Sequence, residues 1–358
     1  MNDANGKRIP AVVSSVRGLT LVELMVAILL GLLLTAGVIN VFIGTQQTNR
    51  TQEAMSSVQE TGRFALDIIA RDAREAGYGG CPGSVNNLLN TASADYDPDL
   101  HELGDAFIDV DSDDLTDYAR GDVLTIASMA QVDGGPFKGD GSDVPSFGLD
   151  EGDKSEIEQG QILLIADPAT GDCEQFQNVP AGPGQINRGP GQNVDPGNIG
   201  PPGQIDYTVF DGPIDILALS SRTYYVGQSP DGETYSLYRR TTTSDADGDP
   251  DHETVEIVAG VYDMSVEYGL DDNDDRQVDR FEWATDMNPG DWADAVAVRV
   301  HLLVYNGQAD NIVDEPRQNL FFPRKGDGDP QVQATFDATD RRLYQTFSTT
   351  VAARNLLE

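Results

Sequence analysis

The sequence contains little lysine, cysteine and histidine. Its 358 residues include 4 Lys, 2 Cys and 3 His, and 60 acidic side chains outnumber 23 basic ones, so the formal net charge is −37. Such a charge repels the phosphate backbone of a nucleic acid, and basic side chains are too few to form a patch for anionic lipid headgroups. The composition therefore argues against both partners. Disorder does not follow, because 39% of the residues are hydrophobic.

The few histidines also argue against catalysis. His101, His252 and His301 are scattered, and His252-Glu253 lacks the second His of a zinc-binding helix. The chain contains neither a Gly-x-Ser-x-Gly nucleophile elbow nor a phosphate-binding Gly-rich loop that ends in Lys-Ser or Lys-Thr. We therefore predict a protein that is not an enzyme and requires no cofactor.

One long apolar segment lies near the N-terminus. Residues 19–44 carry a single charge, Glu23, and 26 residues at ~1.5 Å per residue are enough to cross a bilayer as a helix. The preceding residues 1–18 have a formal charge of +2, so the positive-inside rule keeps them cytoplasmic. A secretory signal would have a shorter apolar core. A plain anchor explains the length but not the carboxylate inside it, which costs roughly 2.5–3.5 kcal/mol on insertion scales and should have a partner.

The start of this segment resembles a known processing motif. Residues 17–23 read Arg-Gly-Leu-Thr-Leu-Val-Glu, which is similar to the cleavage and methylation motif of type IV prepilins, although most of that family has Phe in place of Leu19. The resemblance implies that a prepilin peptidase cuts between Gly18 and Leu19 and that Leu19 is then methylated. Glu23 becomes the fifth residue of the mature chain and, as the resemblance implies, pairs with the N-terminus of a neighbouring subunit during filament assembly.

The helical pattern continues beyond Gly44 and becomes amphipathic. Small and apolar residues recur every three or four positions as far as Ala76, no proline interrupts them, and helix breakers follow from Gly77 to Pro82. We therefore predict one helix over residues 19–76. Its first part, 19–44, would be the membrane and filament-core segment, and its second part, 45–76, would lie against a globular head.

The head resembles minor pilins of the PilW type. Residues 60–81 share that family's Gly-Arg-Phe-Ala stretch and its Ala-Gly-Tyr before a Cys, and residues 261–271, 296–304 and 347–355 are similar to its central and C-terminal strands. We predict an α+β, pilin-like fold with a β-rich head over 77–358. Alternating or apolar runs predict further strands at 123–127, 161–166, 214–219, 223–226, 235–239 and 295–305. The Gly- and Pro-rich residues 179–203 predict a long, mobile surface loop.

Cys81 and Cys173 are the only cysteines. Both would lie outside the inner membrane, where disulfides persist. A bridge would close a loop of about 92 residues (173 − 81) and stabilise the fold by ~4–5 kcal/mol in the chain-entropy model. Two unpaired thiols are the alternative.

One acidic cluster has the spacing of a calcium-binding loop. Oxygen-bearing residues occupy positions 1, 3, 5, 7, 9 and 12 of a twelve-residue window: Asp271, Asn273, Asp275, Gln277, Asp279 and Glu282. Arg276 stands where such a loop usually has Gly, and strands rather than helices are expected on both sides. A calcium site and a solvated acidic hairpin loop both fit this pattern. The acidic stretches 245–253 and 109–117 match it less well.

Together these features predict a minor pilin of the type IV pilus. It would be inserted in the bacterial inner membrane with its N-terminus cytoplasmic and its head periplasmic. The pilus assembly platform would then incorporate it beside other minor and major pilins to prime or cap the filament for twitching motility and adhesion, with a large tip adhesin as a further candidate partner. A J-type pseudopilin of a type II secretion system and a tip adhesin or ligand-binding pilin are the alternatives. Because Asp-rich, Lys-poor surfaces stay hydrated at high salt, we also predict a halophilic or marine source.

Overall fold

The computed structural model describes most of the chain after the first nineteen residues. The described ranges are 20–77, 80–81, 85–96, 101, 106–152, 157–179, 185–190, 194–200, 205–230, 232–244, 249–273, 275–288, 290–306, 312–313, 318–323 and 335–353. The chain divides into two compact units, Met1–Glu53 and Ala54–Glu358. The expected cleavage site, Gly18 and Leu19, lies outside the described residues.

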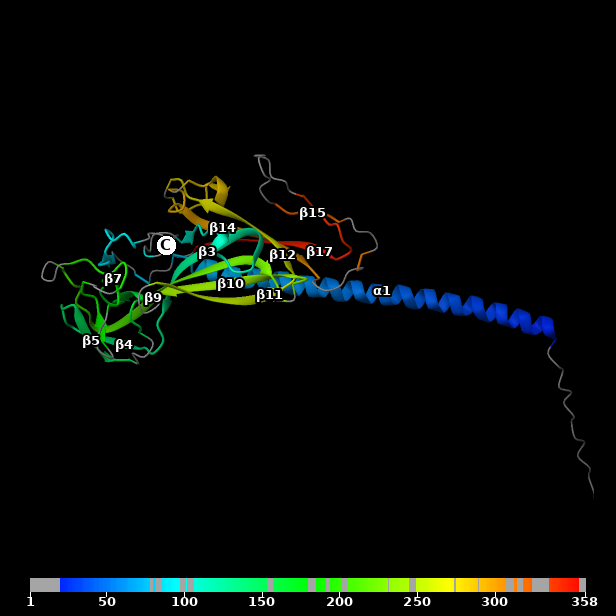
Figure 1. The fold of residues 1–358 in the computed structure, drawn as a ribbon, viewed down its shortest axis with the longest axis horizontal. Coiled ribbons are helices and arrows are strands. Elements are labelled where there is room, and N and C mark those ends of the chain that lie inside the picture. Colours follow the sequence, from blue (N-terminus) through cyan, green and yellow to red (C-terminus); the bar gives the residue numbers. More distant parts are fainter. Residues whose placement is uncertain are drawn as a thin grey trace, which may run out of the picture. The chain divides into compact units, whose positions relative to one another are not determined.

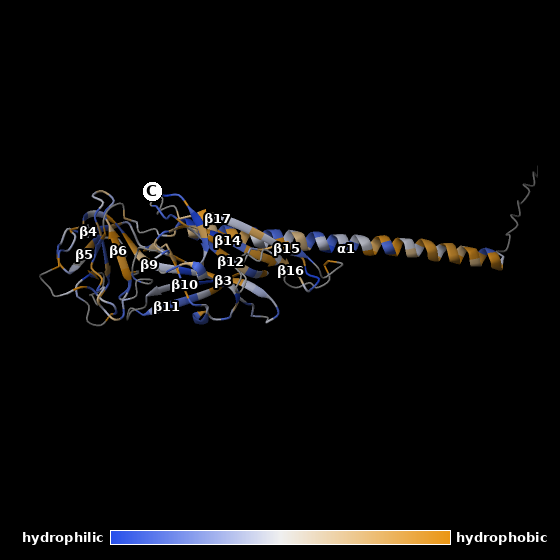
Figure 2. Cartoon of the chain, turned by 90° about the horizontal axis from the view of Figure 1, so that it is seen from above, coloured by the Kyte–Doolittle hydropathy of each residue, from blue (hydrophilic) through white to orange (hydrophobic). Residues whose placement is uncertain are grey.

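A single helix, α1 (Leu21–Arg74), runs through 54 residues (Figure 1). Its N-terminal half is strongly apolar and its C-terminal half alternates between apolar and polar residues (Figure 2). The helix ends two residues before the predicted end at Ala76. The amides of Glu75 and Ala76 bind carbonyls three residues back, which tightens the last turn, and Gly77 follows with a φ of 66°.

The C-terminal half of α1 packs in the main hydrophobic core. Its buried residues follow helical steps of mainly three and four: Ala54, Val58, Gly62, Ala65, Ile69, Ala70, Asp72 and Ala73. Val58, Ala65 and Ile69 belong to the same core cluster as Tyr224 and Val300 from the strands. The predicted α+β fold of a long helix and a β-rich head is therefore confirmed, and the helix is buried in the core from Ala54 onwards.

Two main sheets form the rest of the structure. The large sheet contains β1 (Val85–Asn87), β2 (Phe107–Ile108), β3 (Tyr118–Gln131), β4 (Phe137–Asp140), β5 (Ser146–Glu151), β6 (Ile162–Ala166), β7 (Cys173–Gln177), β8 (Gln185–Asn187), β9 (Asp211–Gln228), β10 (Tyr235–Ser244) and β11 (Pro250–Ala259). The four-stranded sheet has the order β13-β12-β14-β17, formed by β12 (Val261–Leu270), β13 (Arg280–Trp283), β14 (Ala295–Tyr305) and β17 (Tyr344–Ala352). A two-stranded sheet pairs β15 (Asn319–Phe321) with β16 (Thr335–Asp337), and short 3-10 turns occupy η1 (Ser112–Asp114) and η2 (Ala284–Asp286).

The long strand β9 organises the large sheet, because it pairs with β3, β4, β6 and β10. The sequence predicted two separate strands here, 214–219 and 223–226, and that prediction is wrong. The polar residues Ser220, Ser221 and Arg222 look like a break, yet all three stay in register with β3. Arg222 is also neutralised by a carboxylate of the helix, so its charge does not force the strand to end.

Two predicted loops are partly strand or core. Residues 245–253 were expected to be an acidic loop, but Pro250 starts β11, where a strand tolerates proline; residues 245–248 lie outside the described residues. The segment 179–203 was expected on the surface. Its described part instead contains β8 and the buried residues Val179, Ile186 and Val194. The backbone there is held by the side chain of Asn198, which bonds both the amide and the carbonyl of Gln177.

The four-stranded sheet corresponds closely to the predicted strands. The expected ranges 261–271, 295–305 and 347–355 coincide with β12 and β14 and overlap β17. The alternation in 295–305 is typical of a strand that buries one face. Strand β14 buries both, because Val300 faces the helix core while Tyr305 packs in a second cluster with Phe322 and Tyr344.

Candidate functional site

The N-terminal half of α1 exposes its apolar side chains. Large apolar residues from Leu21 to Ile43 are 50–74% exposed, and none of the side chains in its most apolar eighteen-residue window is buried. By length and composition, this helix could cross a membrane. An exposed apolar surface of this length needs an apolar environment, so it is the first candidate functional feature.

Glu23 lies in the first turn of α1 and bonds to the residue that caps the helix. The amide of Glu23 donates to Thr20 Oγ1 at 3.3 Å, and that hydroxyl lies 3.4 Å from Glu23 Oε2, to which it donates. The Thr20 carbonyl accepts the first helical bond, from Leu24. Thr20 is therefore an N-cap and Glu23 occupies the third helical position, a variant of the capping box in which the carboxylate also faces the positive end of the helix dipole.

Asp72 connects the other end of the helix to the large sheet. It is 7% exposed and accepts a hydrogen bond of 2.5 Å from the Tyr224 hydroxyl. Its carboxylate also lies 3.4 Å from Arg222 Nη1 and 4.0 Å from Arg239 Nη1. Burial, together with the Asp72 charge, raises the pKa of Tyr224, so its hydroxyl stays protonated and keeps donating. One carboxylate thus ties α1 to β9 and β10.

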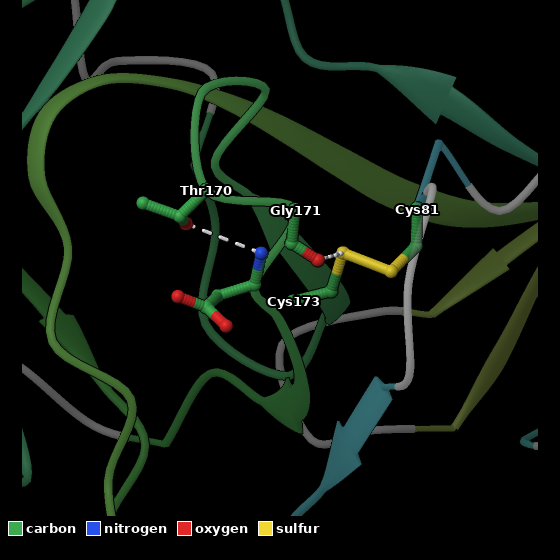
Figure 3. Close-up of a disulfide and its surroundings, with 5 residues drawn as sticks. Cys81, Thr170, Gly171 and Cys173 are labelled. Carbon is green, nitrogen blue, oxygen red and sulfur yellow. Dashed lines mark hydrogen bonds between the residues drawn. A yellow bond between two sulfur atoms is a disulfide. The ribbon is translucent and has the colours of Figure 1, made fainter.

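A disulfide joins Cys81 to Cys173 (Figure 3). Their Cα atoms are 6.0 Å apart and 92 positions separate them in the sequence. Cys81 follows the helix closely and Cys173 begins β7, so the bridge fixes the chain leaving α1 to the large sheet. The turn before Cys173 is supported by a bond from the Asp172 amide to Thr170 Oγ1.

The residues with calcium-loop spacing form a tight turn between β12 and β13. Asp271 is 6% exposed and accepts from the amides of Asn273, Asp275 and Arg276, the last at 2.7 Å. Arg276 has a φ of 66°, the left-handed conformation for which calcium loops usually use Gly. Strands flank the turn, as the sequence predicted.

The oxygens of this turn are occupied by its own donors. Asp279 accepts from the amide of Asp272 and from the Asn273 side chain, and Arg280 binds Glu282 at 2.8 Å. Gln277 donates its amide to Asp275. Within the described residues, no group of three or more His, Cys, Asp or Glu side chains is placed to hold a metal ion. These contacts favour the solvated acidic loop, and calcium binding stays a prediction.

The three histidines are separated. The ring of His101 lies 5.5 Å from that of Tyr96, centroid to centroid, and is tilted by 34°, and His252 bonds Thr242 on the neighbouring strand. His301 is buried, with Nδ1 at 2.6 Å from Ser348 Oγ and Nε2 at 3.2 Å from Glu267 Oε2.

Glu267 is the acidic member of this last group. The bond from His301, with that from Arg299 at 3.2 Å, lowers the pKa of the carboxyl group. These contacts join β12, β14 and β17 across the four-stranded sheet. We therefore assign His301 to the support of the sheet.

Sequence reasoning missed two of these features, the Thr20 cap and Asp72, and also a buried ion pair elsewhere in the fold. The Thr-x-x-Glu spacing at Thr20 is a recognised N-cap signal and could have been found. An acid at a core-facing helix position, as at Asp72, is also a usable signal of a buried partner. The fully buried ion pair of Arg188 with Glu174 had no local signal, because its members come from separate strands and loops.

The long apolar helix and the β-rich head define a pilin-like α+β protein. Residues 223–355, less than half of the chain, match the family model of PilW, described as type IV pilus-assembly protein W. This match supports the assignment of the chain to a PilW-like family, and it covers β10 to β17, including the four-stranded sheet. No curated protein and no solved structure matches the chain.

Proposed function

We propose that the protein is a minor pilin that primes or caps the type IV pilus. The observation that carries this proposal is the exposed apolar half of α1 with one carboxylate in its first turn. An isolated chain needs a membrane to cover that surface, and a filament of parallel pilin helices would cover it equally well. The PilW match supports pilus assembly as the setting.

Processing at the cytoplasmic face is part of the proposal. A prepilin peptidase cuts between Gly18 and Leu19, and methylation of Leu19 follows. Thr20 and Glu23 then form the second and fifth residues of the mature chain. The head remains in the periplasm until the assembly platform moves the protein into the filament beside other minor and major pilins.

In this proposal, the carboxylate of Glu23 pairs with a neighbouring subunit during assembly. In the described chain its carboxylate has only the 3.4 Å contact from Thr20 Oγ1 and the helix dipole to offset its charge. The free N-terminus of a neighbouring subunit provides an opposite charge, and two paired charges are far less costly in an apolar bundle than one alone.

Complementation of a deletion strain tests this role. The strain receives the wild-type gene, Glu23→Gln, or the control Glu53→Gln, which changes an exposed glutamate of the same helix. We expect all three proteins to enter the membrane and to lose the 18-residue leader. Glu23→Gln should fail to restore pili and twitching, whereas Glu53→Gln should restore both.

Three results would count against the proposal. Normal piliation with Glu23→Gln would remove the pairing role. A Gly18→Leu protein of mature mass would remove the processing site. Intact pili with lost protein secretion in the deletion strain would favour a J-type pseudopilin instead.

A further inference from the structure

A polar cavity lies on the large sheet, on the face away from α1. Its volume is about 350 Å³, and it is lined by residues of strands β3, β9, β10 and β11 and of the segment 108–114. Thr125 and Thr223 line it, whereas their neighbours Leu124 and Tyr224 point into the helix core. Because successive side chains of a strand face opposite sides, the cavity and α1 lie on opposite faces of this sheet.

The floor of the cavity is rich in hydroxyl groups. It includes Thr125, Ser221, Thr223 and Thr242, contributed by three neighbouring strands. Thr125 and Thr223 bond each other at 3.0 Å, and Thr242 Oγ1 lies 3.1 Å from His252 Nδ1. Each hydroxyl can both donate and accept, so the floor suits a ligand whose own groups do the same.

Arg240 brings an incompletely satisfied donor to the same cavity. The residue is only 8% exposed, and its Nη1 donates to the Asp114 carbonyl at 2.9 Å. Its buried Nε has no hydrogen-bond partner among the described residues. An unpaired buried donor costs roughly 1–3 kcal/mol, so a ligand oxygen that reached this nitrogen from the cavity would offset that penalty.

The charges around the cavity restrict the class of ligand. Asp109, Asp111 and Asp114 line one side, and they would repel an anion. Arg240 also lines the cavity, next to Asp114, and would oppose a cation. Burial and the nearby Arg240 charge lower the pKa of His252, so this ring is neutral at pH 7 and can accept or donate. A ligand must therefore offer acceptors to Arg240 and donors to the carboxylates without a net charge.

We propose that this cavity binds a neutral sugar unit. Sugar hydroxyls donate to the aspartates and accept from Arg240, and they replace water on the hydroxyl-rich floor. The volume is at the lower end of the ~300–1,000 Å³ range of small-molecule sites, which fits a ligand of one or two sugar rings. The site would give the protein a binding activity that its incorporation into a filament does not require.

Two substitutions and one matched control test the site. Ser221→Phe fills the floor of the cavity, and Thr242→Val removes one hydroxyl at nearly constant volume. Thr243→Val makes the same change at the next residue of β10, which is exposed and does not line the cavity. The full chain is purified in a zwitterionic detergent without a sugar headgroup. Saturation-transfer NMR and calorimetry then use glucose, galactose and mannose, with anionic gluconate, cationic glucosamine and zwitterionic glycine as charged comparisons.

We expect at least one neutral hexose to bind the wild-type chain and Thr243→Val with equal affinity. Ser221→Phe should abolish the saturation-transfer signal, and Thr242→Val should raise Kd about 5–10-fold, the effect of one lost hydrogen bond. If Ser221→Phe does not fold, the difference in Kd between Thr242→Val and Thr243→Val tests the proposal by itself.

The proposal is overturned if no neutral hexose binds, if binding survives Ser221→Phe in a folded protein, or if a charged comparison binds as well as the hexoses. Piliation separates this inference from the proposed function. A wild-type gene that restores pili while its protein binds no hexose would remove only the sugar site. A deletion strain with normal pili would remove only the assembly role.

Discussion

Asp72 and Asp67 offer a direct comparison of two aspartates on the same helix. Asp72 is 7% exposed and contacts Tyr224, Arg222 and Arg239. Asp67 lies on the solvent side, where its side chain is 73% exposed and 3.7 Å from Arg71. Replacing each by alanine removes the same carboxylate. At Asp72 the carboxylate is buried and has bonding partners, whereas at Asp67 it is solvated.

The expected magnitudes differ because the partners left behind differ. Asp72→Ala leaves the Tyr224 hydroxyl unpaired and removes the charge that offsets Arg222 and Arg239. Removing one member of a buried pair costs about 3–5 kcal/mol of unfolding free energy. Asp67→Ala removes an exposed pair worth less than about 1 kcal/mol. Asp72→Asn should lie between them, because its amide oxygen can still accept from Tyr224.

Urea unfolding of the full chain in zwitterionic micelles, followed by circular dichroism, measures the difference. With an m-value of about 3 kcal/mol per M, Asp72→Ala should lower the midpoint by about 1–2 M, and Asp67→Ala should hardly move it. Midpoints for the two alanine variants that agree within error would refute the role assigned to Asp72.

Three further outcomes follow from the described contacts. Gly62→Ala should lower the unfolding free energy by about 1–3 kcal/mol, because the new Cβ would lie 2.7 Å from Cγ of Phe347; Gly44→Ala, with open space around it, is the control and should not destabilise. Cys81→Ser should prevent the 2 Da mass loss on oxidation and lower the urea midpoint. Glu267→Gln should flatten acid unfolding below about pH 4.3, because a lowered pKa contributes stability above the unfolded value that is lost as the pH falls through the folded one. An unchanged acid limb in Glu267→Gln would contradict that assignment.

The local patterns in the sequence predicted the parts of the fold that local patterns determine. The helix could be read from apolar spacing and from the absence of proline, and β14 from its alternating valines. The turn at Arg276 was predicted to lie between strands, which it does. In each case the information lies within about a dozen neighbouring residues.

Features that depend on distant partners could not be read in the same way. Arg222 lies within β9 because Asp72, 150 positions away, offsets its charge. The Gly- and Pro-rich segment contributes Arg188 to the interior because Glu174 receives it there. The polar cavity combines β3, β9, β10 and β11 with the segment 108–114, and no single stretch of sequence contains its pattern.

Among the described residues, the acids lie mainly at the surface rather than in the core. Each buried acid of these ranges accepts at least one hydrogen bond from a named donor: Asp72, Asp167, Glu174, Asp263 and Asp271. Hydrogen bonds thus offset the cost of the few buried charges. The repulsion among the remaining acids acts through solvent, where salt screens it. This distribution is consistent with the predicted halophilic or marine source, which remains a prediction. Glu23 differs from the other surface acids, because it is exposed within an apolar stretch of helix. Under the proposed function, a neighbouring subunit would neutralise its charge inside the filament, where salt cannot screen it.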